Sequence, residues 1–486
     1  MRALLAHPVI HRFVSGGGLG AVKLVTGFVR VKMIAIVIGV AGVGILAQAA
    51  QFNLVAIALT SISLAVGIIN RIRQPARFGD REAERITRGT AFVSLLGLIG
   101  LYLLVVCWNS TLILDSVFHG LLTRWQILPV LMGVPFAVVA SGYIEGIFYS
   151  RDRFDLYVKA SITAALIELA LYLGLVYARG IVGALLALGI SSVTLLASYL
   201  WHLRKLGDSW RAMFPIVFDL REFVVLFRFG ATMLATTAFG YLCVLYVRGE
   251  VLEFYGARSN GLLQVALAFS AYSLPFITNG IWGHLHPLAS KLGDTPEVRK
   301  ELMSVLRVVI ILSSLASLTA LCIPDVLIHI AYVKAFVGAV KFFPAQFIGD
   351  FFYFFAFTLG VFFLATSQLR TYMSGWIAYY GMYLIGSKIL FPHIGPLAPS
   401  AAHALASLVI AACGAAWLIF VVRIKFRELS LFWTGMCMVA SAALLLWYEA
   451  PLWIRLSFLL VPGLIYGKLF LDMRNPAKEQ PHSPPS

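Results

Sequence analysis

Residues 14–38, VSGGGLGAVKLVTGFVRVKMIAIVI, hold three cations (Lys23, Arg30 and Lys32) and no acidic residue. About 20 largely apolar residues cross a bilayer as one helix, so this stretch is long enough to span it. A cation near the bilayer centre costs roughly 2.5–3.5 kcal/mol on insertion scales. Lys23, Gly27 and Arg30 share one helical face, whereas Lys32 lies about 200° from Arg30. The spacing predicts a polar cavity that Lys23 and Arg30 face. The alternative is that Arg30 and Lys32 lie near the helix end and extend to the lipid headgroups.

The composition is that of a polytopic membrane protein. Of the 486 residues, 60% are hydrophobic and only 12% are charged, against about 25% in a typical soluble domain. The net charge of +16 is explained by basic cytoplasmic loops, so no nucleic-acid partner is expected. The five cysteines are scattered without a CxxC pair, which indicates neither a disulfide framework nor a metal site. No cofactor is expected.

Hydropathy and helix-breaking residues predict an all-α integral membrane protein with about fourteen transmembrane helices. The predicted crossings are 14–38, 46–69, 90–108, 126–148, 158–177, 181–201, 223–247, 259–283, 303–323, 341–368, 372–391, 400–422, 430–448 and 452–470. With the N-terminus inside, the cytoplasmic loops carry about four times as many Lys and Arg residues as the opposite loops. This asymmetry predicts that both termini are cytoplasmic.

The two halves of the chain repeat each other at an offset of 217 residues. The matched pairs are Gly39 with Gly256, Gly44 with Gly261, Ser150 with Ser367 and Arg153 with Arg370. Six helices per half make the repeat parallel, as in transporters whose substrate path runs between two lobes. The predicted units are a first six-helix bundle (1–205), a second six-helix bundle (206–425), two extra helices (426–472) and a disordered cytoplasmic tail (473–486).

Ionisable residues inside predicted crossings are candidates for function. Glu168 and Asp350 are possible coupling or pairing carboxylates, whereas Arg228 lies close enough to a helix start to extend to the headgroups. Deep cations match or exceed deep acids, which favours an anionic substrate such as a phosphate group.

Signatures of an enzyme are weak, and no catalytic residue is predicted. The longest outside loops, 109–125 and 324–340, hold one acidic residue each, Asp115 and Asp325. A Walker sequence is absent, so the chain is not expected to hydrolyse nucleotide.

Residues 226–292 and 332–372, which include YVRGEVLEFYGARSNGLLQ and FPAQFIGDFF, resemble Wzx-type flippases of the MOP superfamily. Lys23–Gly44, Asn70-Arg71 and the loop 150–157 fit the same pattern. The likeness is to flippases for O-antigen and enterobacterial common antigen units. It implies two pseudo-symmetric, MATE-like six-helix bundles that alternate in access around a central cationic cavity. The last two helices depart from the usual twelve and are similar to those of fourteen-helix lipid II flippases.

The resemblance implies a flippase of the bacterial inner membrane that moves an undecaprenyl-diphosphate-linked oligosaccharide for surface polysaccharide assembly. Candidate diphosphate contacts are Lys23, Arg30, Arg228 and Arg248, with Lys32, Gln48 and Gln264 as further site candidates. The glycan lipid and membrane lipid are the expected partners, with a polysaccharide polymerase and a chain-length regulator as further candidates. Two alternatives remain open: a MATE-like multidrug or cation antiporter, and a membrane glycan polymerase.

Overall fold

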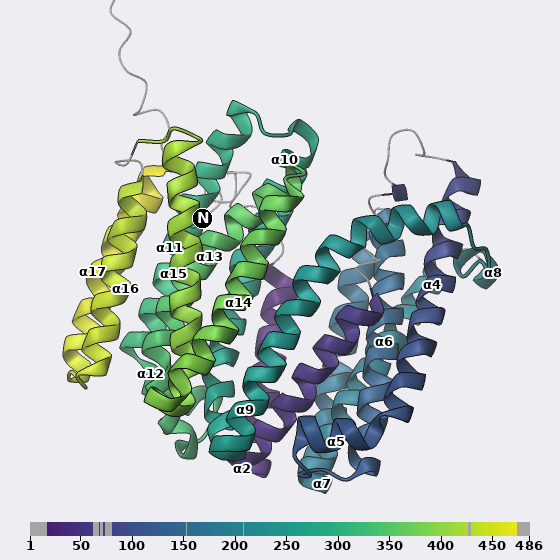
Figure 1. The fold of residues 1–486 in the computed structure, drawn as a ribbon, viewed down its shortest axis with the longest axis horizontal. Helices are drawn as coiled ribbons and strands as arrows, with labels where there is room; N and C mark the ends of the chain where they lie inside the picture. Colours follow the sequence, from purple (N-terminus) through teal and green to yellow (C-terminus); the bar gives the residue numbers. More distant parts are fainter. Residues whose placement is uncertain are drawn as a thin grey trace, which may run out of the picture.

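Long apolar stretches dominate the chain, and in the computed structural model they form a bundle of α-helices (Figure 1). The structure describes residues 17–61, 68, 71–72, 80–151, 153–207, 209–425 and 429–473. Within these ranges there is no β-strand, as expected where backbone groups inside a bilayer must be hydrogen-bonded within each segment. The predicted all-α membrane fold is confirmed. Residues 474–486 of the predicted tail lie outside the described residues.

The described helices include several that are long enough for two crossings. They are α2 (Gly17–Ser61), α4 (Arg81–Trp108), α5 (Ser110–Phe118), α6 (Arg124–Ser150), α7 (Phe154–Leu203), α8 (Trp210–Met213), α9 (Leu220–Gly280), α10 (His286–Leu292), α11 (Pro296–Cys322), α12 (Pro324–Ala331), α13 (Phe343–Ala365), α14 (Leu369–Ile394), α15 (Ala398–Phe420), α16 (Ser430–Trp447) and α17 (Leu452–Met473). Short 3-10 segments at Arg204–Leu206, Lys334–Phe342 and Gly395–Leu397 and a π-helical turn at Ile281–Leu285 join some of them.

Three of these elements are each two helical arms joined at a glycine. The junctions are Gly39 in α2, Gly180 in α7 and Gly256 in α9. A 45-residue helix such as α2 would be about 68 Å long, more than twice the hydrocarbon thickness, so the chain must bend. Gly39 (φ 64°, ψ −171°) and Gly256 (φ 79°, ψ 168°) adopt nearly the same conformation, and they are a matched pair of the sequence repeat.

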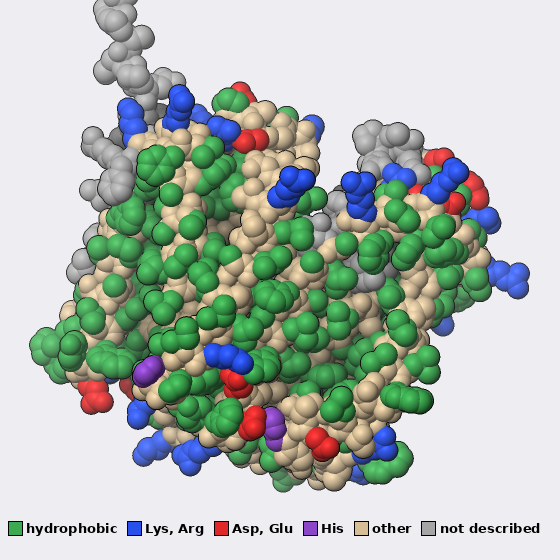
Figure 2. All heavy atoms as spheres, in the orientation of Figure 1, with side chains coloured by type: hydrophobic (Ala, Val, Ile, Leu, Met, Phe, Trp, Pro, Cys, Tyr) green, Lys and Arg blue, Asp and Glu red, His purple; other side chains and the backbone are tan. Residues whose placement is uncertain are grey.

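Figure 1 shows two groups of helices side by side, α4–α7 in one and α11–α17 in the other, with α2 and α9 running between them. The groups diverge at the end that carries α10 and the start of α4, and Figure 2 shows the surface hollowed between them there. We name this the diverged end. At the opposite, converged end, α2 and α9 bend beside each other (Figure 1).

Aromatic side chains of α13 fill the core of the second group. Phe351, Phe354, Phe355 and Phe362 are almost fully buried. Phe432 of α16 packs on this layer, with ring centroids 4.4 Å from Phe355 and 5.6 Å from Phe351. The aromatic run in residues 351–357 therefore joins helices, and it anchors α16 at the outer edge of the group.

The start of α9 is fixed against α4 and the chain before it. Arg71 donates through Nε and Nη2 to the two carboxylate oxygens of Glu222, at 2.9 and 3.0 Å. Thr87 Oγ1 also donates to Glu222 (2.7 Å), and the Asp219 amide donates to Thr90 Oγ1 (3.1 Å). The hydrogen bonds to Glu222 raise the pKa of the Arg71 guanidinium above its usual value. One end of α9 is thereby tied to the first group of helices.

Replacing Gly39 or Gly256 with alanine is expected to lower the free energy of unfolding by about 1–3 kcal/mol, because only glycine readily adopts positive φ with ψ near 180°. The measurement is the thermal unfolding temperature of each purified variant in one detergent. Gly142→Ala, within α6, is the control, since an added Cβ there meets no atom within 4 Å. Equal melting temperatures for Gly39→Ala and Gly142→Ala would contradict the strain argument.

Candidate functional site

The first arms of α2 and α7 bring a cation and a carboxylate together. Arg30 Nη1 donates to Glu168 Oε1 in an ion pair. The guanidinium also lies over the ring of Tyr172, 5.4 Å from its centroid. Glu168 and Tyr172 are one helical turn apart, so their side chains project from the same face of α7. The carboxylate and the aromatic face both stabilise an arginine that is partly withdrawn from water.

A cavity of about 280 Å³ opens beside this pair. It is lined by Thr26, Arg30, Ser161, Ala164, Ala165, Glu168, Leu169 and Leu195. The side chains of Arg30 and Glu168 are 38% and 23% exposed, so a ligand in the cavity can reach both. Towards the described residues Arg30 hydrogen-bonds only through Nη1, and a guanidinium has five N–H donors. The cavity can therefore offer further donors to an anionic group.

Lys32 points elsewhere, as the helical spacing from Arg30 requires. Its Nζ donates to the carbonyl oxygens of His329 (2.5 Å) and Ile330 (3.0 Å) in the last turn of α12. A cation at a helix C-terminus satisfies free carbonyl groups and complements the helix dipole. Lys32 thus links α2 to α12 and takes no part in the Arg30 cavity.

Arg248 belongs to a second polar cluster, on α9. It is 3% exposed, and its Nη1 donates to Gln264 Oε1 on the other arm of the helix, at 2.6 Å. Its Nε and Nη2 have no partner among the described residues. Gln48 of α2 is also buried and donates to the Val117 carbonyl (3.3 Å).

The four cations predicted to contact substrate therefore differ in their surroundings. Arg30 contacts α7, Arg248 contacts the far arm of its own helix, and Arg228 is exposed on the first arm of α9. The side chain of Lys23 lies outside the described residues.

Asp350 is the centre of a buried polar network between α13, α14 and α15. His403 Nε2 lies 3.0 Å from Asp350 Oδ1, and the Tyr379 hydroxyl lies 2.6 Å from His403 Nδ1. Gln346 donates weakly to Asp350 Oδ1 (3.3 Å) and to Ser270 Oγ of α9 (3.1 Å). A neutral His403 can donate to the carboxyl group while it accepts from Tyr379.

Sequence reasoning named Asp350 but missed His403 and Tyr379. The one available signal was His403 itself, an ionisable residue inside an apolar run, since such residues are rare in a bilayer without a partner. His403 and Asp350 are 53 residues apart in the sequence. Helical periodicity relates residues within one helix, so it does not predict a contact between two helices.

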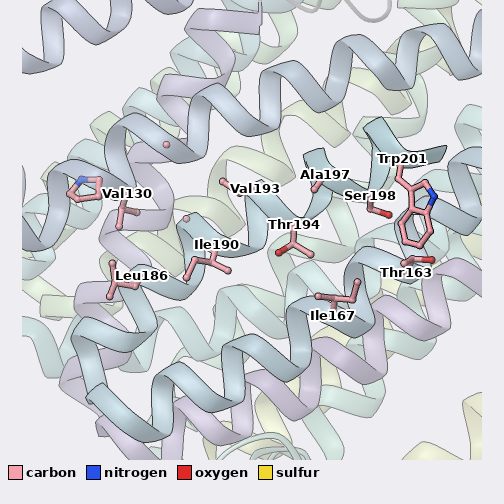
Figure 3. A pocket seen from close by; sticks show the side chains of 13 residues that line it. Val130, Thr163, Ile167, Leu186, Ile190, Val193, Thr194, Ala197, Ser198 and Trp201 are labelled. Atoms are coloured by element: carbon pink, nitrogen blue, oxygen red, sulfur yellow. The ribbon is translucent and has the colours of Figure 1, made fainter. Parts of the chain in front are cut away.

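An apolar cavity of about 520 Å³ lies between α6 and the two arms of α7. Figure 3 shows the side chains of Val130, Ile167, Leu186, Ile190 and Val193 around it, with Trp201 at one end. Ile167, Val193 and Trp201 are about half exposed, as suits side chains that contact lipid. None of the described lining residues is charged, so this groove lacks the cationic donor that Arg30 gives the other cavity.

This chain resembles known membrane transporters in sequence and in structure. No family model matches the chain. It is 23% identical over 389 residues to proteins named lipid III flippase from Escherichia coli (strain K12) and Shigella flexneri, covering 79% of this chain and 91% of each relative. The solved structure of the lipid II flippase MurJ, in an inward closed conformation, superposes with a TM-score of 0.67 at 14% identity, covering 94% of this chain and 98% of that one. An inward-facing MATE family transporter of the MOP superfamily gives 0.62 at 14% identity, covering 86% and 95%.

These similarities show that the chain is an integral membrane protein with the fold of MOP superfamily transporters. The proteins that match it in sequence and in structure are named as flippases and transporters, not as enzymes, which disfavours the glycan polymerase alternative.

Proposed function

We propose that this protein is a flippase that moves an undecaprenyl-diphosphate-linked oligosaccharide across the bacterial inner membrane for surface polysaccharide assembly. The observation that carries the proposal is the sequence relation to lipid III flippases, which extends over 91% of their length. The Arg30 cavity supports it, because a guanidinium can bind phosphate oxygens through two parallel hydrogen bonds.

In this proposal Arg30 exchanges partners during transport. In this structure Arg30 pairs with Glu168, and an entering diphosphate competes for the same guanidinium. Glu168 would then be left without its cation, and a partly buried carboxylate without a partner favours the return of Arg30. The exchange gives a binding site that is selective for anions and that can also release them. Lys23, Arg228 and Arg248 remain candidate contacts along the path, as do Gln264, which accepts from Arg248, and Gln48.

The diverged end is proposed to face the cytoplasm, with both termini on that side, because basic loops favour the cytoplasmic side. The two six-helix lobes, 1–205 and 206–425, would then alternate in access. A polysaccharide polymerase and a chain-length regulator are proposed as partners that use the exported units.

Reconstitution in liposomes tests the function. A polyprenyl-diphosphate disaccharide with a fluorescent group on the sugar is incorporated into both leaflets, and a membrane-impermeant reductant then bleaches the outer leaflet. Vesicles that contain the protein are expected to lose the protected fluorescence, whereas protein-free vesicles keep it. A MATE-like antiporter would instead transport a cationic dye under an ion gradient and leave the glycan lipid in place. That pair of results would overturn the proposal.

A further inference from the structure

The arms of α2 and α9 touch through their backbones at the converged end. Asn260 Nδ2 donates to the carbonyl oxygen of Gly44 at 2.9 Å. A Cβ built on Gly44 would overlap the Ala257 carbonyl oxygen, and one built on Gly261 would overlap the Val40 carbonyl oxygen. Small residues that let two helices approach this closely are a recurring device of membrane helix packing.

The contact follows the internal symmetry of the chain. Gly44 and Gly261 are a matched pair of the 217-residue repeat, and each lies five residues after a matched junction glycine, Gly39 or Gly256. Each lobe therefore contributes the same piece, a bend followed by a close-approach glycine. At the same end, Lys32 bonds the last carbonyl groups of α12. These contacts join the two groups of helices where Figure 1 shows them converging.

Buried polar groups around the crossing destabilise its closed form. Gln48, Arg248 and Asn260 are each no more than 3% exposed. Among the described residues, Gln48 Oε1, Asn260 Oδ1 and two Arg248 nitrogens have no hydrogen-bond partner. Burying an unsatisfied polar group costs free energy that water returns once the group is exposed. Separation of α2 from α9 would hydrate these groups. The gain in their hydration free energy would therefore favour opening of the contact.

We propose that the crossing of α2 and α9 at Gly44 and Gly261 is the gate that closes the converged end of the transport path, and that its opening exposes Gln48, Arg248 and Asn260 to the lumen. The role of the gate rests on the proposed transport function. Its geometry is independent of the substrate. The gate depends on backbone contact, so no change of side-chain rotamer can make room for an added methyl group.

Gly44→Ala and Gly261→Ala are therefore expected to hold the converged end open. In a cysteine-free background, spin labels at Asp115 and Lys334 report on the converged end, and labels at Lys205 and Lys291 report on the diverged end; all four side chains are exposed. Both alanine variants should lengthen the Asp115–Lys334 distance and shorten the Lys205–Lys291 distance relative to the parent protein. Gly97→Ala in α4 is the matched control, since its Cβ meets no atom within 4 Å, and it should leave both distances unchanged.

If both alanine variants fold and give the same distances as the parent protein, the proposed gate is refuted. If either variant fails to fold, Asn260→Ala tests the same contact. It adds no atom between the helices and only removes the hydrogen bond to Gly44. It should raise the population with a long Asp115–Lys334 distance, and an unchanged distribution would refute the proposal. The distances are measured without substrate. A gate that opens in a protein that fails to flip the glycan lipid would therefore reject the proposed function alone.

Discussion

Arg30→Gln is expected to weaken binding of a polyprenyl diphosphate by roughly 10- to 150-fold, because a hydrogen bond to a charged group contributes about 1.5–3 kcal/mol. Binding is measured by titrating the purified protein in detergent with a fluorescent polyprenyl diphosphate. Flipping in liposomes should fall with it. Arg30→Lys should recover part of the affinity, since a point charge keeps the attraction but loses the planar two-pronged geometry.

Glu168→Gln should act in the opposite direction on binding. It removes the competitor for Arg30 while keeping a side chain of similar size, so affinity should rise while flipping falls because release is slowed. Lys32→Gln is the matched charge control, since Lys32 lies on the same helix but bonds the end of α12. It should leave diphosphate affinity near that of the parent. If Arg30→Gln has the affinity and flipping rate of the parent, with normal amounts of folded protein, Arg30 is not part of the diphosphate-binding site.

The helical spacing within residues 14–38 predicted correctly that Arg30 and Lys32 face different ways. Local periodicity fixes relative direction along one helix, and the structure places the two cations against α7 and α12 respectively. The constant offset between Gly39 and Gly256 likewise pointed to equivalent positions, which the structure shows as equivalent bends. Repeats and periodicity are properties of the sequence, so both could be seen in advance.

The partners of these residues could not be predicted in the same way. Glu168 is 138 residues from Arg30, and His403 is 53 residues from Asp350. Which helices lie side by side is decided by packing between crossings, and single-sequence hydropathy contains no record of it. The sequence listed Arg30 and Arg248 as one cationic group, but their hydrogen-bond partners lie on different helices. Intramembrane charges were found from the sequence, whereas their pairing needed the fold.

His403→Ala is expected to destabilise the protein by about 3 kcal/mol, the cost of leaving a buried carboxyl group without its main hydrogen-bond donor. Asp350 and His403 are 5% and 8% exposed. Without the imidazole, the one hydrogen bond that the described residues still give the Asp350 carboxyl group is the weak 3.3 Å bond from Gln346. The measurement is the thermal unfolding temperature of the purified variants in one detergent. Asp350→Asn should cost much less, because the amide stays neutral and can still bond the ring.

The double variant Asp350→Asn/His403→Ala separates the lost hydrogen bond to the carboxyl group from simple loss of packing. If His403→Ala destabilises the protein because the Asp350 carboxyl group loses its hydrogen-bond donor, adding Asp350→Asn should restore part of the lost stability. Ser407→Ala is the control in the same helix, since its 3.4 Å contact with His403 Nδ1 is marginal and its removal should change the unfolding temperature little. Equal unfolding temperatures for His403→Ala and the double variant would mean that His403 stabilises α15 by filling space alone. A stable Asp350→Asn variant that no longer flips the glycan lipid would instead give the carboxyl group a role in transport that stability alone does not require.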